Sequence, residues 1–231
     1  MAYKIDIILL TFNNINNTKK CIDHLYKFTK NFGLVILDNN STDGTQEYLK
    51  ELCDQHDNIT FFFSKYNLGI IKGRNRAYKL SKDAEYIIFL DSDQYVEEDW
   101  LESYLEMMKN YDVVGVEAWL MRERDFYPVK KIRSREEEFS YVGCGSLMIK
   151  RRVFEELGKF DERFFMYFED PDFCWKAHEA GYKIGWNYNG VIIHNHPGPL
   201  LNSKTRKYFM NSWKKFKEKW NGKKLPVLKM E

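Results

Sequence analysis

The stretch YIIFLDSDQYV, residues 86–96, combines a strand signal with two closely spaced carboxylates. The run from Tyr86 to Asp91 has the continuous apolar character of a buried strand. Asp91, Ser92 and Asp93 then follow where that strand ends. Like charges crowded at a strand end have two interpretations: they form a polar turn that leads into a helix, or they hold a cation. Taken alone, the pair favours the turn.

The chain before this stretch alternates strand and helix signals. Apolar runs at residues 4–11, 33–38, 59–63 and 86–91 are separated by segments whose apolar residues have helical spacing. This βαβαβαβ order predicts an α/β fold, with a mostly parallel sheet covered by helices on both faces. Parallel strands bring their carboxyl ends to one edge of the sheet, where ligands bind. Four polar residues are expected to meet there: Thr11, Asp38, Ser64 and Asp91.

After Trp100 the pattern changes. A helix is expected over residues 98–110 and a single strand over 112–121. The charged stretch 122–138 has no clear periodicity and predicts a mobile loop. No internal repeat, low-complexity tract or Pro-rich linker divides the chain, so residues 1–231 are expected to form one domain with two functional halves.

The last third carries three further signals. A strand and a short helix follow Gly143 and Gly145, and the next helix ends at Gly181. The segment VIIHNH, residues 191–196, reads as extended chain. Residues 205–226 form a basic, aromatic, amphipathic helix pattern.

Composition excludes several classes of protein. The 44% hydrophobic content suffices for a substantial core, and 36 Lys plus Arg against 34 Asp plus Glu leaves a net charge of only +2. No overall field therefore recruits nucleic acid. The four cysteines lie far apart without a CxxC pair, which indicates neither a zinc site nor a disulfide framework. The apolar run 5–12 is interrupted by Asp6 and is too short for a secretion signal or a membrane span, so we expect a cytoplasmic protein.

A second acidic cluster lies at residues 169–172, where Glu169, Asp170 and Asp172 surround Pro171. Crowded carboxylates repel, which raises the proton affinity of at least one and suits a general base working near neutral pH. The alternative is structural: Asp170 as the N-cap and Pro171 as the first helical residue would start a helix, and capping would lower the Asp170 pKa. Glu169 is the alternative base.

Two histidines extend the list of candidate ligands. Alternation in the segment 191–196 puts His194 and His196 on one face, where an imidazole would complete a metal site begun by Asp93. Packing or solvation is the simpler interpretation for both. The chain has neither GxxxxGK nor GxGxxG, so no glycine loop is available to cradle phosphates and a diphosphate would need a metal.

The ordered set of motifs resembles the family 2 glycosyltransferases with the GT-A fold along nearly the whole chain. TFNN (11–14) and LDNNSTDGT (37–45) are similar to the nucleotide-contacting turns of that family, and NLGIIKGRNRAY (67–78) to the segment before its DxD motif. FLDSD (89–93) matches the DxD motif itself. Residues 143–182 resemble the acceptor-side segment that contains the ED motif, and VIIHNH lies where a metal-binding histidine is often found.

The resemblance implies a Rossmann-like GT-A domain with a nucleotide-sugar-binding half, residues 1–110, and an acceptor-side half, residues 111–231, that includes the C-terminal helix. It implies a metal-dependent, inverting glycosyltransferase that uses Mn²⁺ or Mg²⁺. The donor would be a nucleotide-diphosphate sugar, with UDP-sugars favoured. The acceptor hydroxyl would belong to a glycan, lipid-linked or protein acceptor in glycan or cell-surface polysaccharide synthesis.

The resemblance also implies roles for single residues. Asp170 would deprotonate the acceptor hydroxyl, and Asp93 would bind the metal together with His194 or His196. Asp38 would face the base, and Asp91 would hold the ribose or the metal. The nucleotide-sugar would be bound by a larger set: Thr11, Asp38, Asn40, Asn67, Arg74, Asp91 and Ser92.

The acceptor-side candidates are Gly143, Gly145, Asp172 and Trp186. The two glycines would let an acceptor approach the backbone, although a tight turn explains them equally well. Trp186 would stack on a sugar, with core packing as the alternative.

Three questions stay open at this point. The C-terminal helix either meets an anionic membrane surface, as a peripheral contact at the inner face of the membrane, or packs against the domain, which is the favoured interpretation. A sugar-phosphate nucleotidyltransferase also uses a parallel sheet and a divalent ion, although the missing glycine loop weighs against it. A non-catalytic nucleotide-sugar or glycan-binding protein is the third possibility.

Overall fold

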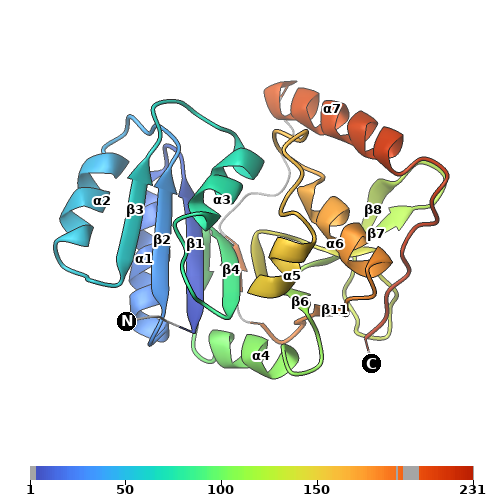
Figure 1. Ribbon diagram of the computed structural model, residues 1–231, viewed down its shortest axis with the longest axis horizontal. Helices are drawn as coiled ribbons and strands as arrows, with labels where there is room; N and C mark the ends of the chain where they lie inside the picture. Colours follow the sequence, from blue (N-terminus) through green and yellow to red (C-terminus); the bar gives the residue numbers. More distant parts are fainter. Residues whose placement is uncertain (1–3, 191, 195–202, 231) are drawn as a thin grey trace.

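The computed structural model describes residues 4–190, 192–194 and 203–230, and its centre is a mixed β-sheet (Figure 1). The seven described strands lie in the order β11-β6-β10-β4-β1-β2-β3. They are β1 (Ile5–Thr11), β2 (Gly33–Asp38), β3 (Ile59–Phe63), β4 (Tyr86–Asp91), β6 (Val113–Gly115), β10 (Ser146–Lys150) and β11 (Ile184–Trp186). Only β10 runs antiparallel to its neighbours in this sheet, which confirms the predicted mostly parallel α/β architecture.

Helices cover both faces of this sheet, because its central strands are apolar on both sides. Ile7 and Leu9 of β1 face a core cluster shared with α1, α2 and α4, whereas Ile8 faces a cluster shared with α3, α5 and α6. The helices are α1 (Ile15–Phe28), α2 (Thr45–Cys53), α3 (Ile70–Tyr78), α4 (Trp100–Met107), α5 (Arg151–Glu156), α6 (Glu169–Glu179) and α7 (Ser203–Lys219).

Two small sheets flank the large one. β5 (Gln94–Val96) pairs antiparallel with β12 (Ile192–His194), so the chain just after the DxD motif lies beside the histidine segment. β7 (Ala118–Arg122) pairs antiparallel with both β8 (Tyr127–Lys131) and β9 (Tyr141–Val142). The sheet β8-β7-β9 lies on the side of the molecule that also carries α6 and α7 (Figure 1).

The structure corrects two expectations about residues 112–138. The strand expected over 112–121 is two strands, since β6 belongs to the large sheet and β7 to a small one. The charged stretch 122–138 is not a loop throughout, because β8 forms a hairpin with β7 whose turn is closed by Arg122 and Asp125 at 2.6 Å. The sequence did not predict β8 because both Val129 and Lys130 face solvent, so its apolar and polar residues do not alternate.

The start of α6 also differs from the N-cap expected at Asp170. The helix begins at Glu169, and Phe168 precedes it in the left-handed region with φ 68°. Asp170 is therefore a residue of the first helical turn, and Pro171 is the next one. A proline in the first turn costs no helix hydrogen bond, since those N–H groups have no partner within the helix.

The expected meeting of polar strand ends is confirmed by the strand register. Thr11 lies directly opposite Asp38, and Asp38 lies opposite Phe63, the residue before Ser64. Asp91 lies opposite Leu10 on the other side of β1. The carboxyl edge of the large sheet therefore gathers these side chains from separate segments of the chain.

Helix α7 packs against the domain, as the favoured interpretation of its pattern predicted. Phe216 is fully buried, and the ring of Trp220 stacks on Trp175 of α6 with centroids 4.6 Å apart. Exposed basic residues, such as Lys207 and Lys214, lie on the outer face. Within the described ranges, no helix has the length and apolar character needed to cross a membrane.

Phe216→Ala tests whether this docking stabilises the fold. Removing a fully buried aromatic ring should lower the free energy of unfolding by about 3 kcal/mol or more, because it leaves a cavity. Urea denaturation followed by circular dichroism measures the change. Lys214→Ala on the exposed side of α7 is the control and should stay within about 0.5 kcal/mol of the wild type. Equal stability of both variants would contradict the packing of α7.

Candidate active site

The turn after β2 is built around the carboxylate of Asp38. This carboxylate accepts hydrogen bonds from the Thr11 hydroxyl (2.9 Å), the Ser41 backbone N–H (2.9 Å) and Gln46 Nε2 (2.8 Å). Asp38 and Thr11 are both fully buried. Thr11 and Asp38, two of the predicted nucleotide contacts, thus lie together and shape the turn. Asn40, a third, is exposed and has a φ of 71°.

Asn39, which the sequence did not single out, joins this turn to the segment before α3. Its side-chain oxygen accepts from the Leu68 backbone N–H at 2.7 Å, and its Nδ2 donates to Asn67 Oδ1 at 3.0 Å. Asn67 Oδ1 also accepts from the Gly69 N–H at 2.8 Å. The structure therefore places Asn67 in the scaffold of the nucleotide-side turns, with its side-chain oxygen already engaged.

Arg74 of α3 connects the two acidic clusters. Its Nη2 donates to Asp91 Oδ1 at 2.6 Å, and its Nη1 donates to Glu169 Oε1 at 3.3 Å. The Arg74 side chain is only 4% exposed. Burial alone would lower the pKa of Arg74, but the charges of Asp91 and Glu169 outweigh that effect and raise it. The guanidinium is therefore permanently charged and fixed between the DxD and ED segments.

Glu169 and Asp170 differ in their surroundings. Glu169 is buried, and its Oε2 has no hydrogen-bond partner among the described residues. Burial raises the Glu169 pKa to about 8, with the charge of Asp170 adding to the effect and Arg74 opposing it. Asp170 is more accessible, accepts the Cys144 N–H at Oδ2 (3.3 Å), and has a pKa that burial raises despite the opposing charge of Arg74. A raised pKa suits proton acceptance near neutral pH.

The pairing of β5 with β12 brings His194 to Asp93. Their Nε2 and Oδ1 atoms lie 3.6 Å apart, and the hydrogen bond to Asp93 is the main cause that raises the His194 pKa. A carboxylate oxygen and an imidazole nitrogen suit Mn²⁺, and both side chains are partly exposed. Three or more potential protein ligands do not cluster within the described ranges. Ser92 lies between the two aspartates and is partly exposed, and His196 lies outside the described residues.

A cavity of about 370 Å³ opens between these groups, and we call it the acidic cavity. His194 and Gln94 border it on the side of the DxD motif. Its carboxylates are those of Asp91, Glu117, Glu169 and Asp170. Its aromatic lining, which we call the aromatic wall, is formed by Trp119, Tyr127, Tyr141, Tyr167 and Phe209.

Gly143 and Gly145 both line the acidic cavity. A Cβ at Gly143 would lie 3.8 Å from Asp170 Oδ2, so a side chain there would fill space beside this carboxylate. A Cβ at Gly145 would come within 2.5 Å of Gln94 Nε2 and 3.1 Å of Asp91 Oδ2. The glycines thus keep backbone close to both acidic clusters.

The structure places two predicted acceptor-side residues elsewhere. Asp172 is buried beneath α7, where its carboxylate accepts from Lys219 Nζ and from Trp220 Nε1 at 2.9 Å. Trp186 is buried at the sheet edge and donates from Nε1 to the Val116 carbonyl at 3.0 Å. Neither lines the acidic cavity, because both side chains serve packing between elements.

The sequence missed the aromatic wall and also Gln94 and Glu117. Trp119 and Tyr127 belong to the hairpin that was expected to be partly a loop, and Phe209 reaches the cavity only through the long-range docking of α7. Gln94 directly follows the DxD motif, and this position is the local sequence signal that could have identified it as a site residue.

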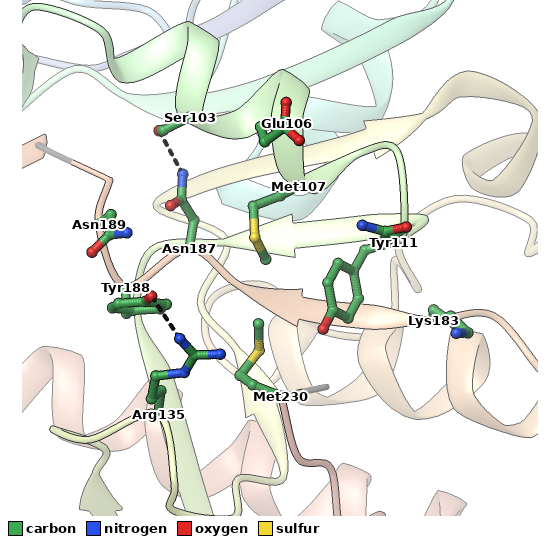
Figure 2. Close-up of a pocket in the computed structure, with 11 residues that line it drawn as sticks. Ser103, Glu106, Met107, Tyr111, Arg135, Lys183, Asn187, Tyr188, Asn189 and Met230 are labelled. Carbon is green, nitrogen blue, oxygen red and sulfur yellow. Dashed lines mark hydrogen bonds between the residues drawn. The ribbon is translucent and has the colours of Figure 1, made fainter.

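A second cavity, of about 500 Å³, lies between α4, the chain after β11 and the C-terminal segment (Figure 2). Its lining includes Ser103, which accepts from Asn187 Nδ2 at 2.8 Å, and Tyr188, whose hydroxyl accepts from Arg135 Nη1 at 3.1 Å. Glu106 is the carboxylate among its described lining residues and is paired with Lys109. It therefore has no grouped carboxylates like those of the acidic cavity.

Comparisons with known proteins agree with this geometry. The model of the family "Glycosyl transferase family 2" matches residues 6–177. The low-salt glycan biosynthesis hexosyltransferase of Haloferax volcanii is 26% identical over 221 residues, which cover 85% of this chain and 69% of that protein.

Two solved structures share the fold. One is a mannosyltransferase from Pyrobaculum calidifontis in complex with GDP-Man and Mn²⁺ (TM-score 0.75, 18% identity, 98% of this chain). The other is GalNAc-T7 with UDP, GalNAc and Mn²⁺ (TM-score 0.77, 15% identity, 96% of this chain). This chain covers 66% and 49% of those two chains.

Both structural neighbours are glycosyltransferases with the GT-A fold, which identifies the mixed sheet and its flanking helices as that fold. Because the family model covers most of the chain, the match also decides between the enzyme classes that the sequence left open, in favour of sugar transfer over nucleotidyl transfer. The chain belongs to glycosyl transferase family 2 and is a glycosyltransferase.

Proposed function

We propose that the protein transfers a hexosyl group from a nucleotide-diphosphate sugar to an acceptor hydroxyl, with inversion at the anomeric carbon and with a divalent cation. The observation that carries this proposal is that His194 and Asp170 line the same cavity, while His194 lies beside Asp93. Mn²⁺ with GDP-Man and Mn²⁺ with UDP in the two structural neighbours support the same donor chemistry. We favour a UDP-sugar, as the family resemblance implied, and the UDP bound in GalNAc-T7 supports that choice.

Asp93 and His194 are the residues that would hold the cation. A divalent ion there, Mn²⁺ or Mg²⁺, supplies positive charge against the negative charge that develops on the leaving diphosphate. Asp91, the first residue of the DxD motif, is paired with Arg74 of α3, with Oδ1 and Nη2 2.6 Å apart. We propose that its carboxylate contacts the ribose or the metal from this position.

Asp170 is the proposed general base. The acceptor oxygen forms the new bond to the anomeric carbon while the bond from that carbon to the diphosphate oxygen breaks, and Asp170 takes the acceptor proton. Attack from the face opposite the diphosphate inverts the configuration in one step. The greater accessibility of Asp170 favours it over Glu169, whose Oε1 is held by Arg74.

Two expectations stay predictions. A role in glycan or cell-surface polysaccharide synthesis is in keeping with the name of the Haloferax volcanii relative, a hexosyltransferase of low-salt glycan biosynthesis, and a cytoplasmic location stays an expectation from the sequence. A peripheral membrane contact through α7 would use its exposed basic side, which includes Arg206 and Lys207, and not the aromatic side that packs inward.

An assay of UDP-, GDP- and dTDP-sugars with Mn²⁺ or Mg²⁺ would identify the donor. We expect nucleotide release from at least one donor, fastest with a UDP-sugar, and loss of that release when EDTA removes the metal. Release measured by a coupled assay and thermal shift with each nucleotide are the two readouts. Turnover that persists in EDTA would contradict the metal-dependent mechanism.

Asp170→Asn tests the base. Because the amide cannot accept the proton, kcat for transfer should fall by about 10² to 10⁴, while donor binding stays near the wild-type value. Glu169→Gln should retain more activity, and Glu179→Gln, an exposed change at the other end of α6, is the matched control. Full activity in Asp170→Asn together with loss in Glu169→Gln would move the base to Glu169.

Asp93→Ala tests the metal site. Loss of a carboxylate ligand should weaken Mn²⁺-dependent binding of UDP by at least about tenfold. Isothermal titration of UDP with and without Mn²⁺ measures this. Glu98→Ala removes an exposed carboxylate from the same segment and should leave the Mn²⁺ dependence unchanged. Equal Mn²⁺ dependence in both variants would place the cation elsewhere.

The pKa of Glu169 predicts a pH dependence of stability. Between its ordinary value of 4.5 and about 8, the folded protein keeps a proton that the unfolded chain has released. The free energy of unfolding should therefore fall as pH rises through this window, by up to about 1.4 kcal/mol per pH unit. Glu169→Gln should flatten this slope in urea denaturation, whereas Glu98→Gln should keep it. An unchanged slope in Glu169→Gln would show that Glu169 does not hold the proton.

A further inference from the structure

We propose that the acceptor is a neutral glycoside whose sugar ring stacks on the aromatic wall of the acidic cavity, with Trp119 and Tyr127 as its main contacts. This inference rests on the proposed function and narrows its acceptor, which the sequence left as a glycan, a lipid-linked molecule or a protein. The contrasting acceptor class bears phosphate, as a polyprenyl phosphate or a phosphodiester-linked polyol does.

The aromatic wall is assembled from three parts of the structure: the small sheet β8-β7-β9, the segment just before α6, and helix α7. Trp119 of β7 lies directly opposite Tyr141 of β9, so both side chains are on one face of the small sheet. The rings of Tyr127 and Phe209 lie 5.6 Å apart, and those of Tyr167 and Phe209 lie 5.7 Å apart. Helix α7 thus completes a continuous aromatic surface that begins on the β7–β8 hairpin.

The wall faces a space and is not simply core. Trp119 and Tyr127 are both only partly buried and line the cavity. Among the described residues, none hydrogen-bonds to Trp119 Nε1 or to the hydroxyl of Tyr127, although both are polar groups beside apolar rings. Rings of this kind offer an apolar face together with a polar edge, which suits a ligand with C–H faces and hydroxyl edges.

One buried oxygen at the cavity favours a ligand that can donate a hydrogen bond. Gln94 Oε1 has no partner among the described residues, and Gln94 is 2% exposed. Leaving a buried acceptor unpaired is costly, so the bound state should satisfy it. A sugar hydroxyl donates to an amide oxygen, whereas an ionised phosphate has only acceptor oxygens.

The charge of the cavity favours the same class. Four carboxylates line the acidic cavity. The guanidinium of Arg74, which also lines it, is already paired with both Asp91 and Glu169. Lys131, whose Nζ lies 5.9 Å from the centre of the Trp119 ring, is paired with Glu117. Arg122, beside the Tyr127 ring, is paired with Asp125. Even with Glu169 protonated, the wall around an acceptor is negative, so an anionic acceptor would be repelled.

The position of the wall also suits the chemistry. Tyr141 of the wall and Asp170 line the same cavity, and the charge of Asp170 adds to the effect of burial that raises the pKa of the Tyr141 hydroxyl. Gly143 leaves space beside Asp170 Oδ2. A ring lying on Trp119 and Tyr127 can therefore present a hydroxyl edge to Asp170.

The first test compares acceptors on the wild-type protein. Aryl and methyl hexopyranosides, a short-chain polyprenyl phosphate and a glycerol phosphate oligomer are each offered with the donor that the nucleotide panel identifies. We expect transfer to at least one neutral hexopyranoside, with kcat/KM at least about tenfold above that for either phosphate-bearing acceptor. Transfer only to the phosphate-bearing molecules, or donor hydrolysis with no transfer to any glycoside, would overturn the proposal.

The second test uses variants of the wall. Trp119→Ala should raise KM for the glycoside by about tenfold while the rate and KM of acceptor-free donor hydrolysis stay unchanged, and Trp119→Phe should recover part of the loss. Tyr188→Ala removes an exposed aromatic ring from the second cavity (Figure 2) and is the matched control. A larger effect of Tyr188→Ala would place the acceptor in that cavity, and a raised donor KM in Trp119→Ala would assign the wall to the donor. Either result overturns the proposal.

Donor hydrolysis separates the two levels of inference. If no nucleotide-sugar is hydrolysed or transferred under any metal, the proposed function fails. If a donor is turned over and the glycoside KM does not respond to Trp119→Ala, only the acceptor assignment fails.

Discussion

The site depends on one buried guanidinium that serves two carboxylates. Asp91 ends β4 in the first half of the chain and Glu169 begins α6 in the second half, and Arg74 bridges them from α3. Burying a guanidinium is costly unless it is paired, and the partly exposed Asp91 and the buried Glu169 supply that pairing, so the arrangement is stable only while both partners remain. The planar fork of arginine supplies two donors in fixed directions, which lysine cannot do. Arg74 therefore sets the distance between the DxD side and the ED side of the cavity.

The same bridge bears on the raised pKa values of the ED pair. One positive charge stands among Asp91, Glu169 and Asp170, so it cannot neutralise all three. Glu169 is buried more completely than Asp170, and burial raises its pKa to about 8. With Glu169 holding a proton, the ionised form of the more accessible Asp170 meets less repulsion. A buried neutral acid beside an accessible carboxylate is a division of roles set by environment, since both residues start from similar chemistry.

Much of the first half was predictable from sequence because its structure follows local signals. Apolar strands, helical spacing and the register of parallel strands together placed Thr11, Asp38 and Asp91 at one edge. The second half depends on contacts between distant segments. No local pattern pairs His194 with the strand after Asp93, or brings Phe209 to Tyr127, and the charged hairpin that carries Trp119 lacks apolar alternation. The burial of Asp172 beneath α7 was unpredictable for the same reason, since its partners Lys219 and Trp220 lie in the C-terminal segment.

The two sides of the site differ in how completely their polar groups are satisfied. In the turns that follow β1 and β2, Asp38 and Asn39 use their side-chain atoms to hold the backbone, so these residues give shape. At the acidic cavity, Gln94 and Glu169 each keep a buried oxygen that has no partner among the described residues. A folded chain tolerates such atoms at a cost in stability, and functional sites are where that cost is commonly carried. The unpaired oxygen of Gln94 therefore indicates where the proposed hydroxylated ligand would complete the structure, in the same cavity that the aromatic wall lines.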